Sequence, residues 1–551
     1  MKILILGGYG VFGGRLARLL AGCAELELLI GGRSLAAARA FCQAYVGQAR
    51  VTPLQVDRVH VAQALADQRP ALLVDASGPF QDYGQHRYGV IEACIAAGVD
   101  YLDFADAADF VFGVDQFDTA AKAAGVFVLS GVSSFPVLTA AVVGQMARSM
   151  AVTEVEGGIA PSPYAGIGLN VMRAVVGYAG EPVTLRRGGK AATAPGLTES
   201  RRFTVAVPGR VPLANLRFSL VDVPDLQVIP PEHPQLADIW MGAGPLPESL
   251  HRVLNMLAKA RAALPLPSLV PASRLFYAVL NAMKFGEHRG GMYVRARGLR
   301  DGQVVEQSWH LLAEGDDGPY IPSMAIEAVI AQLRAGQRPD NGARSGSGAL
   351  TLADYDRLFA GRRIYTGWRL TTDGPHLYQA LLGSAYAQLP APVRALHGSG
   401  QARVWQGRAR ITRGRGLLAR AVARVFGFPP AGKDVPVQVS FTPHAGGERW
   451  QRHFGSHTFS TWQGAGQGRN QYLLLERFGA LCIAMALVVE GERLRLVPRR
   501  MTVLGVPLPR ALLPNGDTFE TAVGDDFVFD VTVALPWVGH VVSYQGRLRP
   551  A

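Results

Sequence analysis

The stretch Ile3-Leu4-Ile5-Leu6-Gly7-Gly8-Tyr9-Gly10-Val11-Phe12-Gly13 decides the fold, because it joins a run of apolar residues directly to a glycine-rich turn. Leu16, Leu19 and Leu20 follow at helical spacing, so the turn opens a helix. A strand that ends in glycines and leads into a helix is typical of the first unit of a parallel sheet. The sequence therefore predicts that the chain begins with a doubly wound α/β domain.

The region that follows supports this prediction. Short apolar runs alternate with segments of helical length, at residues 26–30, 51–56, 71–77, 99–104 and 126–130. Buried parallel strands have this almost continuous apolar character. We therefore predict an α/β Rossmann-type doubly wound parallel sheet over residues 1–135, with a return helix at about residues 320–360.

Beyond residue 135 the pattern changes. Residues 136–320 mix strand-like alternation with proline-rich turns, which predicts an α+β domain for substrate binding and dimerisation. Residues 321–337 predict a helix that Gly336 ends, and residues 340–348 predict a flexible connector. The many alternating stretches of residues 375–551 predict a β-rich (α+β) C-terminal domain that carries a few helices.

The glycine turn has the features of a pyrophosphate site. Gly7 permits a tight turn, Gly10 leaves room for phosphates, and Gly13 lets the helix pack closely on the strand. Unpaired amide groups and the positive end of the helix dipole attract an anion there. Taken alone, the motif would also fit a purely structural turn. Its position between strand and helix favours a dinucleotide cofactor, and the candidate residues are Gly7, Gly8, Tyr9, Gly10, Val11, Phe12 and Gly13.

The end of the second predicted strand indicates which dinucleotide binds. An NAD enzyme is expected to carry Asp or Glu there, whereas this chain has Gly31-Gly32-Arg33-Ser34. A guanidinium with a neighbouring hydroxyl suits a 2′-phosphate, so we predict NADP(H) in preference to NAD(H). The alternative is that Arg33 is a solvated residue beside Ser34, which would cap the next helix. Asp57, directly after the third predicted strand, is a further candidate cofactor residue.

Three segments resemble the saccharopine dehydrogenase-like oxidoreductases. They are Asp75-Ala76-Ser77-Gly78-Pro79-Phe80, Ala97-Gly98-Val99-Asp100-Tyr101-Leu102-Asp103 and Gly131-Val132-Ser133-Ser134-Phe135-Pro136. The resemblance implies NADP(H) or NAD(H) chemistry at a C–N or C=O bond of a substrate held between the first two domains. It adds Ala76, Ser77, Gly78, Pro79 and Phe80 to the candidate cofactor residues.

The chain departs from that family after Asp103. Many members continue with Asp-x-x-Gly-Glu, whereas this chain reads Asp103-Phe104-Ala105-Asp106-Ala107, and the later turn lacks the acidic residue often found in it. These departures put the amino-acid substrate of the family in doubt. From about residue 375 the chain resembles a bacterial domain of unknown function, DUF4166, through Leu381-Leu382-Gly383, Leu389-Pro390 and the segment Trp450 to Gly455. That resemblance implies no activity.

Candidate proton-transfer residues follow the predicted strand ends. They are Tyr83, Asp103 and Asp106, with His86 as a further candidate. Each has a plainer alternative, since Asp103 would also cap a turn and His86 would also suit a solvated helix. A Tyr-x-x-x-Lys pair, which would lower the pKa of a phenol, does not occur in the sequence.

Two features of the C-terminal region invite other interpretations. His444, His453 and His457 lie close in sequence, but Arg452 stands between them and would repel a cation, so we predict no metal site. Residues 413–428 predict a basic amphipathic helix with Leu417, Leu418, Ala421, Val422 and Val425 on one side. We expect that side to pack on the C-terminal sheet, with a membrane surface as the alternative.

Composition narrows the function classes. The formal charge of +12 would suit an anionic partner, but the basic residues are not interleaved with aromatic ones, which argues against nucleic-acid binding. The four cysteines have no metal or disulfide spacing, and no secretory signal is evident, so we expect a cytoplasmic location, with contact to the inner membrane left open.

The prediction for function is an NADP(H)-dependent oxidoreductase that acts on a small carbonyl or imine substrate. A substrate that is linked to a lipid is included in this prediction. A homodimer is compatible with it. The alternative is a non-catalytic NADP-binding protein whose C-terminal domain binds a lipid or a protein partner.

Overall fold

A computed structural model describes residues 1–84, 86–166, 168–370 and 376–551. By contacts between residues the chain divides into two units. The first comprises residues 1–201 and 217–365, and the second comprises residues 202–216 and 366–551. The first two predicted domains therefore lie in the first unit, apart from residues 202–216.

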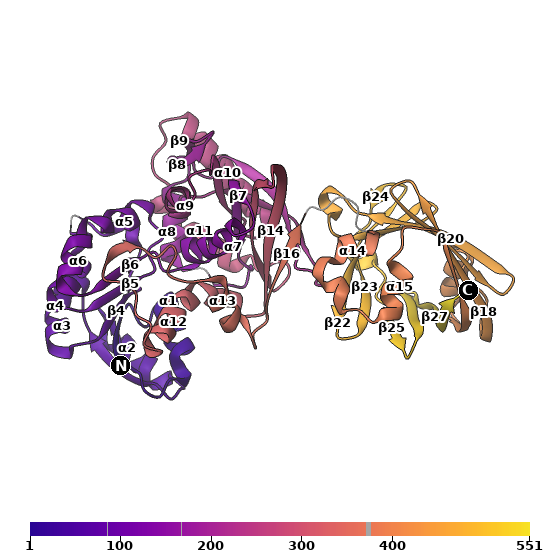
Figure 1. The fold of residues 1–551 in the computed structure, drawn as a ribbon, viewed down its shortest axis with the longest axis horizontal. Coiled ribbons are helices and arrows are strands. Elements are labelled where there is room, and N and C mark those ends of the chain that lie inside the picture. Colours follow the sequence, from indigo (N-terminus) through magenta and orange to yellow (C-terminus); the bar gives the residue numbers. More distant parts are fainter. Residues whose placement is uncertain (85, 167, 371–375) are drawn as a thin grey trace. The chain divides into compact units, whose positions relative to one another are not determined.

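The first unit begins with a seven-stranded parallel sheet (Figure 1). The strand order β3-β2-β1-β4-β5-β6-β15 reverses its direction beside β1, as in the doubly wound fold that the sequence predicts. The core of β1 is Ile3 to Leu6, whose apolar side chains are almost fully buried. The strands are β1 (Lys2–Leu6), β2 (Glu27–Gly32), β3 (Arg50–Gln55), β4 (Leu72–Asp75), β5 (Asp100–Asp103), β6 (Phe127–Ser130) and β15 (Gly342–Ser345).

Helices connect the strands of this sheet. They are α1 (Val11–Leu19), α2 (Leu35–Ala44), α3 (Val61–Gln68), α4 (Gly89–Ala97), α5 (Ala108–Gly113) and α6 (Asp118–Ala124). The return helix α12 (Ile321–Arg334) buries Met324, Ala328 and Ile330 and packs beside α1 (Figure 1). The Ser323 hydroxyl donates to the Phe12 carbonyl at 3.3 Å, which ties α12 to the glycine turn.

The prediction of a flexible connector at residues 340–348 is wrong. Residues 342–345 form β15, which pairs in parallel with β6 and becomes the edge strand of the sheet. So short a segment has no helical or strand pattern of its own, and its backbone groups find their partners only in β6, which lies more than 200 residues earlier in the sequence.

A second, mixed sheet has seven strands in the order β10-β11-β12-β7-β13-β14-β16, and β7, β12, β13 and β14 lie wholly in the first unit. These are β7 (Ala151–Ala160), β10 (Ser200–Val205), β11 (Leu213–Leu220), β12 (Asp238–Ala243), β13 (Arg289–Arg300), β14 (Gln303–Glu314) and β16 (Ile364–Leu370). A separate hairpin consists of β8 (Pro182–Arg187) and β9 (Lys190–Pro195). The accompanying helices are α7 (Thr139–Ala147), α8 (Leu169–Gly177), α9 (Asp225–Glu232), α10 (Glu248–Ala263), α11 (Ser273–Ala282) and α13 (Leu352–Phe359).

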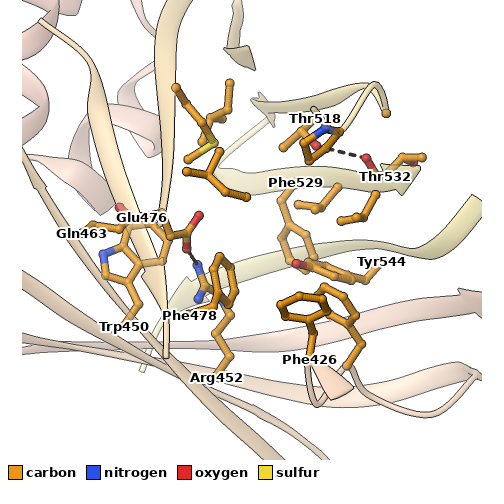
Figure 2. A pocket seen from close by; sticks show the side chains of 18 of the residues that line it. Phe426, Trp450, Arg452, Gln463, Glu476, Phe478, Thr518, Phe529, Thr532 and Tyr544 are labelled. Carbon is orange, nitrogen blue, oxygen red and sulfur yellow. Dashed lines mark hydrogen bonds and ion pairs between the residues drawn. The ribbon is translucent and has the colours of Figure 1, made fainter. Parts of the chain in front are cut away.

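The second unit is an antiparallel barrel, in agreement with the predicted β-rich domain. Ten strands form a closed ring because β22 pairs with β23 as well as with β21, while β24 pairs only with β23. Apolar and aromatic side chains line a cavity inside it (Figure 2). The strands are β17 (Arg403–Arg413), β18 (Gly432–His444), β19 (Gly447–Phe454), β20 (His457–Ala465), β21 (Leu474–Phe478), β22 (Leu481–Glu490), β23 (Arg493–Val503), β24 (Val506–Pro507), β25 (Thr518–Val523), β26 (Asp526–Leu535) and β27 (Gly539–Pro550), with helices α14 (Leu377–Leu382), α15 (Ala391–His397) and α16 (Leu417–Val425).

The packing side predicted for the basic amphipathic helix is right for Val422, which packs on the core of the barrel, and wrong for the larger residues around it. In α16 the buried residues are Ala419 and Ala423, whereas Leu417, Leu418 and Val425 are exposed. Small side chains allow the helix backbone to approach β27 closely, so the alanines face the barrel in place of these three residues. None of the helices in the described ranges combines the length and the apolar character that crossing a membrane requires.

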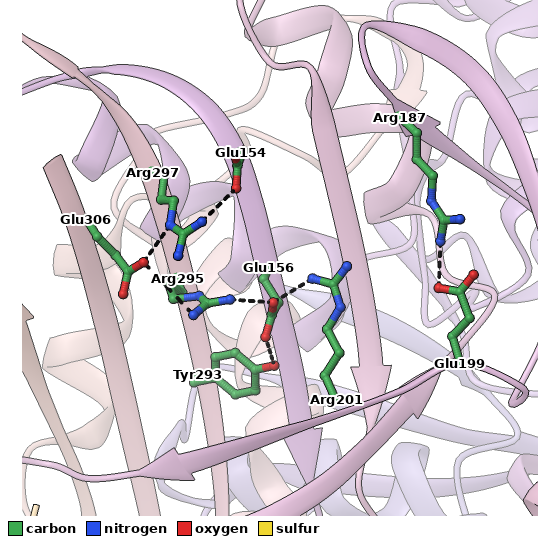
Figure 3. A network of polar contacts seen from close by, with 9 residues as sticks. All are labelled: Glu154, Glu156, Arg187, Glu199, Arg201, Tyr293, Arg295, Arg297 and Glu306. Atoms are coloured by element: carbon green, nitrogen blue, oxygen red, sulfur yellow. Dashed lines mark hydrogen bonds and ion pairs between the residues drawn. The ribbon is translucent and has the colours of Figure 1, made fainter. Parts of the chain in front are cut away.

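A buried carboxylate ties the second sheet of the first unit together (Figure 3). Glu156 on β7 accepts hydrogen bonds from the Tyr293 hydroxyl at 2.7 Å, from Arg201 at 2.6 Å and from Arg295 at 2.7 Å. Burial alone would raise the pKa of Glu156, but the two guanidinium groups and the phenol outweigh it and lower that pKa. Glu156 thus links β7, β10 and β13 through charge-assisted hydrogen bonds.

We expect Glu156→Gln to lower the free energy of unfolding at neutral pH by about 2 kcal/mol, since hydrogen bonds to charged groups contribute about that much. A carboxyl whose pKa is lowered by folding stabilises the protein above its unfolded-state pKa, and this contribution disappears as the pH falls through the folded-state value. The difference between variant and parent should therefore shrink in acid. Denaturant unfolding at several pH values measures this difference.

Glu306→Gln, which removes a more exposed partner of Arg297 in the same network, should cost at most about 1 kcal/mol. Equal losses of unfolding free energy in the two variants would contradict the stabilising role that we assign to Glu156.

Candidate functional site

The glycine turn after β1 has no room for side chains at its two ends. Gly7 has a φ of 79°, and a Cβ atom there would lie 2.7 Å from the carbonyl oxygen of Ala76. A Cβ on Gly13 would lie 2.5 Å from the Gly7 carbonyl oxygen and 2.8 Å from Gly8 Cα. The amides of Gly7 and Gly8 both donate to the Gly31 carbonyl, at 2.9 and 3.0 Å. The turn is therefore held against both β2 and the loop after β4.

The N-terminus of α1 remains open to an anion. Gly10 is its N-cap residue and offers no side chain, and the first turn of the helix carries no acidic residue. Val11 is 41% exposed, so this end of the helix reaches solvent. Amide groups at such a helix end, together with its dipole, bind phosphates. The local structure thus fits the dinucleotide that the motif predicts.

Tyr9, Arg33 and Ser34 gather beside this turn. A Cβ on Gly32 would lie 2.4 Å from the Tyr9 ring, so the glycine lets the ring cover the end of β2. The Tyr9 hydroxyl accepts a hydrogen bond from the Ser34 amide at 3.1 Å. The Arg33 side chain is exposed and follows β2 directly. Ser34 caps α2, because its hydroxyl accepts a hydrogen bond from the Ala37 amide at 3.2 Å. The alternative interpretation of Arg33 as a solvated residue beside a capping Ser34 expects this contact. Their contact with cofactor stays a prediction.

Asp57 lies in a turn of its own. Its carboxylate accepts from the Val59 amide at 3.1 Å and caps the short helical turn after β3. The role of Asp57 in holding cofactor also stays a prediction.

The loop after β4 contains Ala76, Ser77, Gly78, Pro79 and Phe80 and is organised by the buried carboxylate of Asp75. That carboxylate accepts from the Ser77 amide at 2.9 Å, from the Ser77 hydroxyl at 2.7 Å and from the Tyr83 hydroxyl at 3.0 Å. Burial and the charge of Asp75 raise the pKa of Tyr83. The Tyr83 hydroxyl, predicted as a proton donor, is thus engaged in holding the loop.

Asp103 is equally enclosed at the end of β5. Its carboxylate accepts from the Gly131 amide at 2.7 Å, from the Ser130 hydroxyl at 2.8 Å and from the Ala105 amide at 2.9 Å, and no part of the residue is exposed. Burial raises the pKa of Asp103 to about 7. These contacts join the loops after β5 and β6, as in the plainer interpretation of Asp103 as a turn cap.

Asp106 differs because it is half-buried and shares its surroundings with two other titratable groups. The Gln81 side chain donates to Asp106 at 3.1 Å, and burial raises the pKa of this carboxyl. Burial and the charges of Asp109 and Asp106 raise the pKa of Asp222 to about 6. Burial and the charges of Asp106 and Asp222 also raise the pKa of Tyr178. The charge of Asp106 thus acts on Asp222 and Tyr178, which lie in the later part of the unit that carries the second sheet.

Sequence reasoning missed Tyr178, Asp222 and Asn170. Asn170 on α8 donates to the Gly78 carbonyl at 2.7 Å, and Arg15 on α1 donates to the Ala165 carbonyl at 3.0 Å, so Asn170 contacts the loop after β4 and Ala165 contacts α1. These residues lie 64 to 116 positions after Asp106 and have no shared spacing. Only their position in the fold marks them. His86, by contrast, is simply exposed.

The three C-terminal histidines are occupied separately. A ring nitrogen of His453 lies 2.8 Å from the Thr458 hydroxyl, and one of His457 lies 2.6 Å from the Gly427 carbonyl. His444 ends β18. No group of three or more side chains able to hold a metal ion occurs in the described parts of the chain.

The sheet order, the glycine turn and the open helix end define a Rossmann-type dinucleotide-binding domain, as in NAD(P)-dependent oxidoreductases. Residues 3–129 match the family described as saccharopine dehydrogenase NADP binding domain, and NADP(H) is the cofactor of this domain. Residues 389–548 match DUF4166, a domain of unknown function. Both resemblances recognised in the sequence are thereby confirmed. Among curated proteins no match is found.

Solved structures of dehydrogenases are similar to this chain at low identity. Apo saccharopine dehydrogenase (L-Glu forming) from Saccharomyces cerevisiae is 13% identical, with a TM-score of 0.48 over 67% of this chain and 100% of that one. DAP dehydrogenase of C. glutamicum, in complex with DAP, is 14% identical, with a TM-score of 0.34 over 66% of this chain and 98% of that one.

Proposed function

We propose that this chain transfers hydride between NADP(H) and a small carbonyl or imine carbon, and that Asp106 exchanges the accompanying proton. The nicotinamide supplies or accepts the hydride when it is bound. The observation that supports the proposal is that Asp106 is half-buried in the loop after β5, accepts from Gln81 and acts by its charge on Asp222 and Tyr178, in the same unit as the NADP(H) turn. Ligands of doubly wound sheets bind at this carboxyl end of the strands.

Asp106 suits a proton donor better than the other two predicted residues do. Asp103 and Tyr83 are engaged in hydrogen bonds that hold loops, whereas Asp106 has one neutral partner, Gln81, and is partly accessible. Burial keeps its carboxyl protonated to higher pH than that of an exposed aspartate. In reduction, the carboxyl proton would pass to the carbonyl oxygen or imine nitrogen as hydride reaches the carbon, and in oxidation it would return to Asp106.

NADPH oxidation with a panel of ketones, imines and long-chain aldehydes tests the proposal. The panel includes lipid aldehydes because a lipid portion would fit the apolar interior of the second unit. Saturable turnover of at least one member is the expected result. Absence of turnover throughout, with tight NADPH binding intact, would overturn the catalytic proposal.

A non-catalytic role is the second candidate, and the closed barrel with its internal cavity favours it. In that case NADP(H) would be a structural or sensing ligand, and the barrel would carry a lipid or contact a protein partner. The departures from the family pattern after Asp103 are consistent with it. The panel above separates the two candidates.

Cofactor selectivity rests on Arg33. Arg33→Ala should weaken NADPH binding about tenfold, because a charge-assisted hydrogen bond to phosphate contributes about 1.5 kcal/mol. NADH, which lacks the 2′-phosphate, should bind almost as before. Titration of intrinsic fluorescence gives both dissociation constants. Arg39→Ala, at an exposed position on α2, is the matched control and should change neither. Equal losses of NADPH and NADH affinity in Arg33→Ala would refute the assigned selectivity.

A further inference from the structure

The barrel of the second unit encloses a cavity of about 270 Å³. This exceeds the engineered apolar cavity of about 150 Å³ that binds benzene in a well-studied lysozyme. Aromatic and aliphatic side chains from many strands form its wall, among them Phe428, Ile483, Met485, Phe529 and Tyr544. An interior of this kind is typical of a site for an apolar ligand.

One part of the wall is polar, and its charges are already paired. Arg452 donates to Glu476 at 3.2 Å (Figure 2). It also donates to the Thr461 hydroxyl at 2.9 Å, and Thr461 donates to Glu476 at 2.9 Å. Arg452 and Glu476 are 13% and 11% exposed. The pair therefore lies inside the barrel, where little water screens it.

Two further polar groups border the same cavity. Glu520 lies 2.6 Å from a ring nitrogen of the fully buried His397, and the Gln463 carbonyl accepts from the Tyr378 hydroxyl at 2.9 Å. The charged residues in the described wall are Arg452, Glu476 and Glu520, which is one cation facing two carboxylates. A ligand carboxylate would meet two like charges and no unpaired cation, and burying it would be costly.

We propose that this cavity binds a neutral long-chain molecule with a hydroxyl or carbonyl group at one end, in preference to a fatty-acid anion. The chain would fill the apolar part, and the polar end would exchange hydrogen bonds with Gln463 and with the Arg452–Glu476 pair. The inference goes beyond the proposed redox function and does not depend on it. If both hold, the hydroxyl and carbonyl forms are also the two redox states that an NADP(H)-dependent enzyme interconverts.

Displacement of the neutral fluorophore N-phenylnaphthylamine from the full-length chain, without NADPH, tests the preference. The competitors are dodecanol, dodecanal and dodecanoate at neutral pH, below their micellar concentrations. We expect the alcohol and the aldehyde to displace the probe at concentrations at least about tenfold lower than dodecanoate, given the cost of burying an unpaired charge. Equal or stronger displacement by dodecanoate, or no displacement by any of the three, would overturn the proposal.

Glu476→Gln tests the charge argument directly. It leaves the Arg452 guanidinium without its carboxylate, so dodecanoate should gain about tenfold relative to dodecanol. Glu490→Gln is the matched control, because Glu490 on β22 is an exposed partner of Arg495. In this variant the preference for dodecanol over dodecanoate should not change. Circular dichroism establishes that each variant is folded, and the competition on the unmodified chain decides the proposal if Glu476→Gln fails to fold. A folded Glu476→Gln whose preference is unchanged would also overturn it. Turnover of the substrate panel plays no part in this readout, so failure of the redox proposal would be seen separately.

Discussion

Replacing Asp106 with asparagine should lower kcat for NADPH-dependent reduction by about 10²- to 10⁴-fold, the range over which general acid catalysis contributes. The amide is nearly isosteric with the carboxyl and keeps the contact with Gln81, but it has no proton to give. NADPH binding should stay close to that of the parent, since Asp106 belongs to the loop after β5 and not to the glycine turn. Stopped-flow oxidation of NADPH with the best substrate of the panel measures the rate.

The pH dependence supplies a second readout for Asp106. A donor must be protonated, so the rate of reduction should fall as the pH rises through the pKa of this carboxyl, which burial has raised. In the asparagine variant that limb of the profile should disappear. Asp115→Asn, at an exposed position shortly afterwards in the chain, is the control and should keep both the rate and the profile. A loss of less than about tenfold in Asp106→Asn would remove this residue from the proton-transfer step.

Gly13→Val should reduce NADPH affinity by at least about 100-fold, because overpacking against fixed backbone costs roughly 3 kcal/mol. The first added carbon alone would lie 2.5 Å from the Gly7 carbonyl oxygen, and neither backbone segment can yield without moving α1 away from β1. That movement would displace the amide groups that face the pyrophosphate.

Gly22→Val is the matched control for Gly13→Val. Gly22 follows the same helix, and a Cβ there would meet no atom within 4 Å. Isothermal titration with NADPH, preceded by circular dichroism, compares the two variants. Tight NADPH binding by a folded Gly13→Val protein would mean that the anion does not rest at this turn.

The cofactor domain could be predicted because its decisive features are local. The run from Ile3 to Gly13 encodes a buried strand, a turn with positive φ at Gly7 and a helix end without a cap, all within one short segment. The position of Arg33 directly after β2 could be predicted in the same way, since the apolar pattern gives the length of that strand. The second unit could be placed among β-rich domains from its alternation alone.

Other parts escaped prediction for physical reasons. β15 is four residues long and gains its hydrogen bonds from a distant strand, so it looked like a connector. On α16 the apolar pattern pointed to Leu417, Leu418 and Val425, but close packing on β27 selected the alanines. Asp222 and Tyr178 carry no motif, and only the fold brings them near Asp106.

The amino-acid sequence by itself determined the Rossmann domain, its glycine turn and its preference for NADP(H), because these depend on contacts between residues near one another in the chain. Only the tertiary structure decided which carboxyl groups share an environment with Asp106, that β22 closes the barrel on β23, and that Arg452 is neutralised by Glu476. Such pairings depend on burial and on partners far away in the sequence, and short-range patterns hold no information about either.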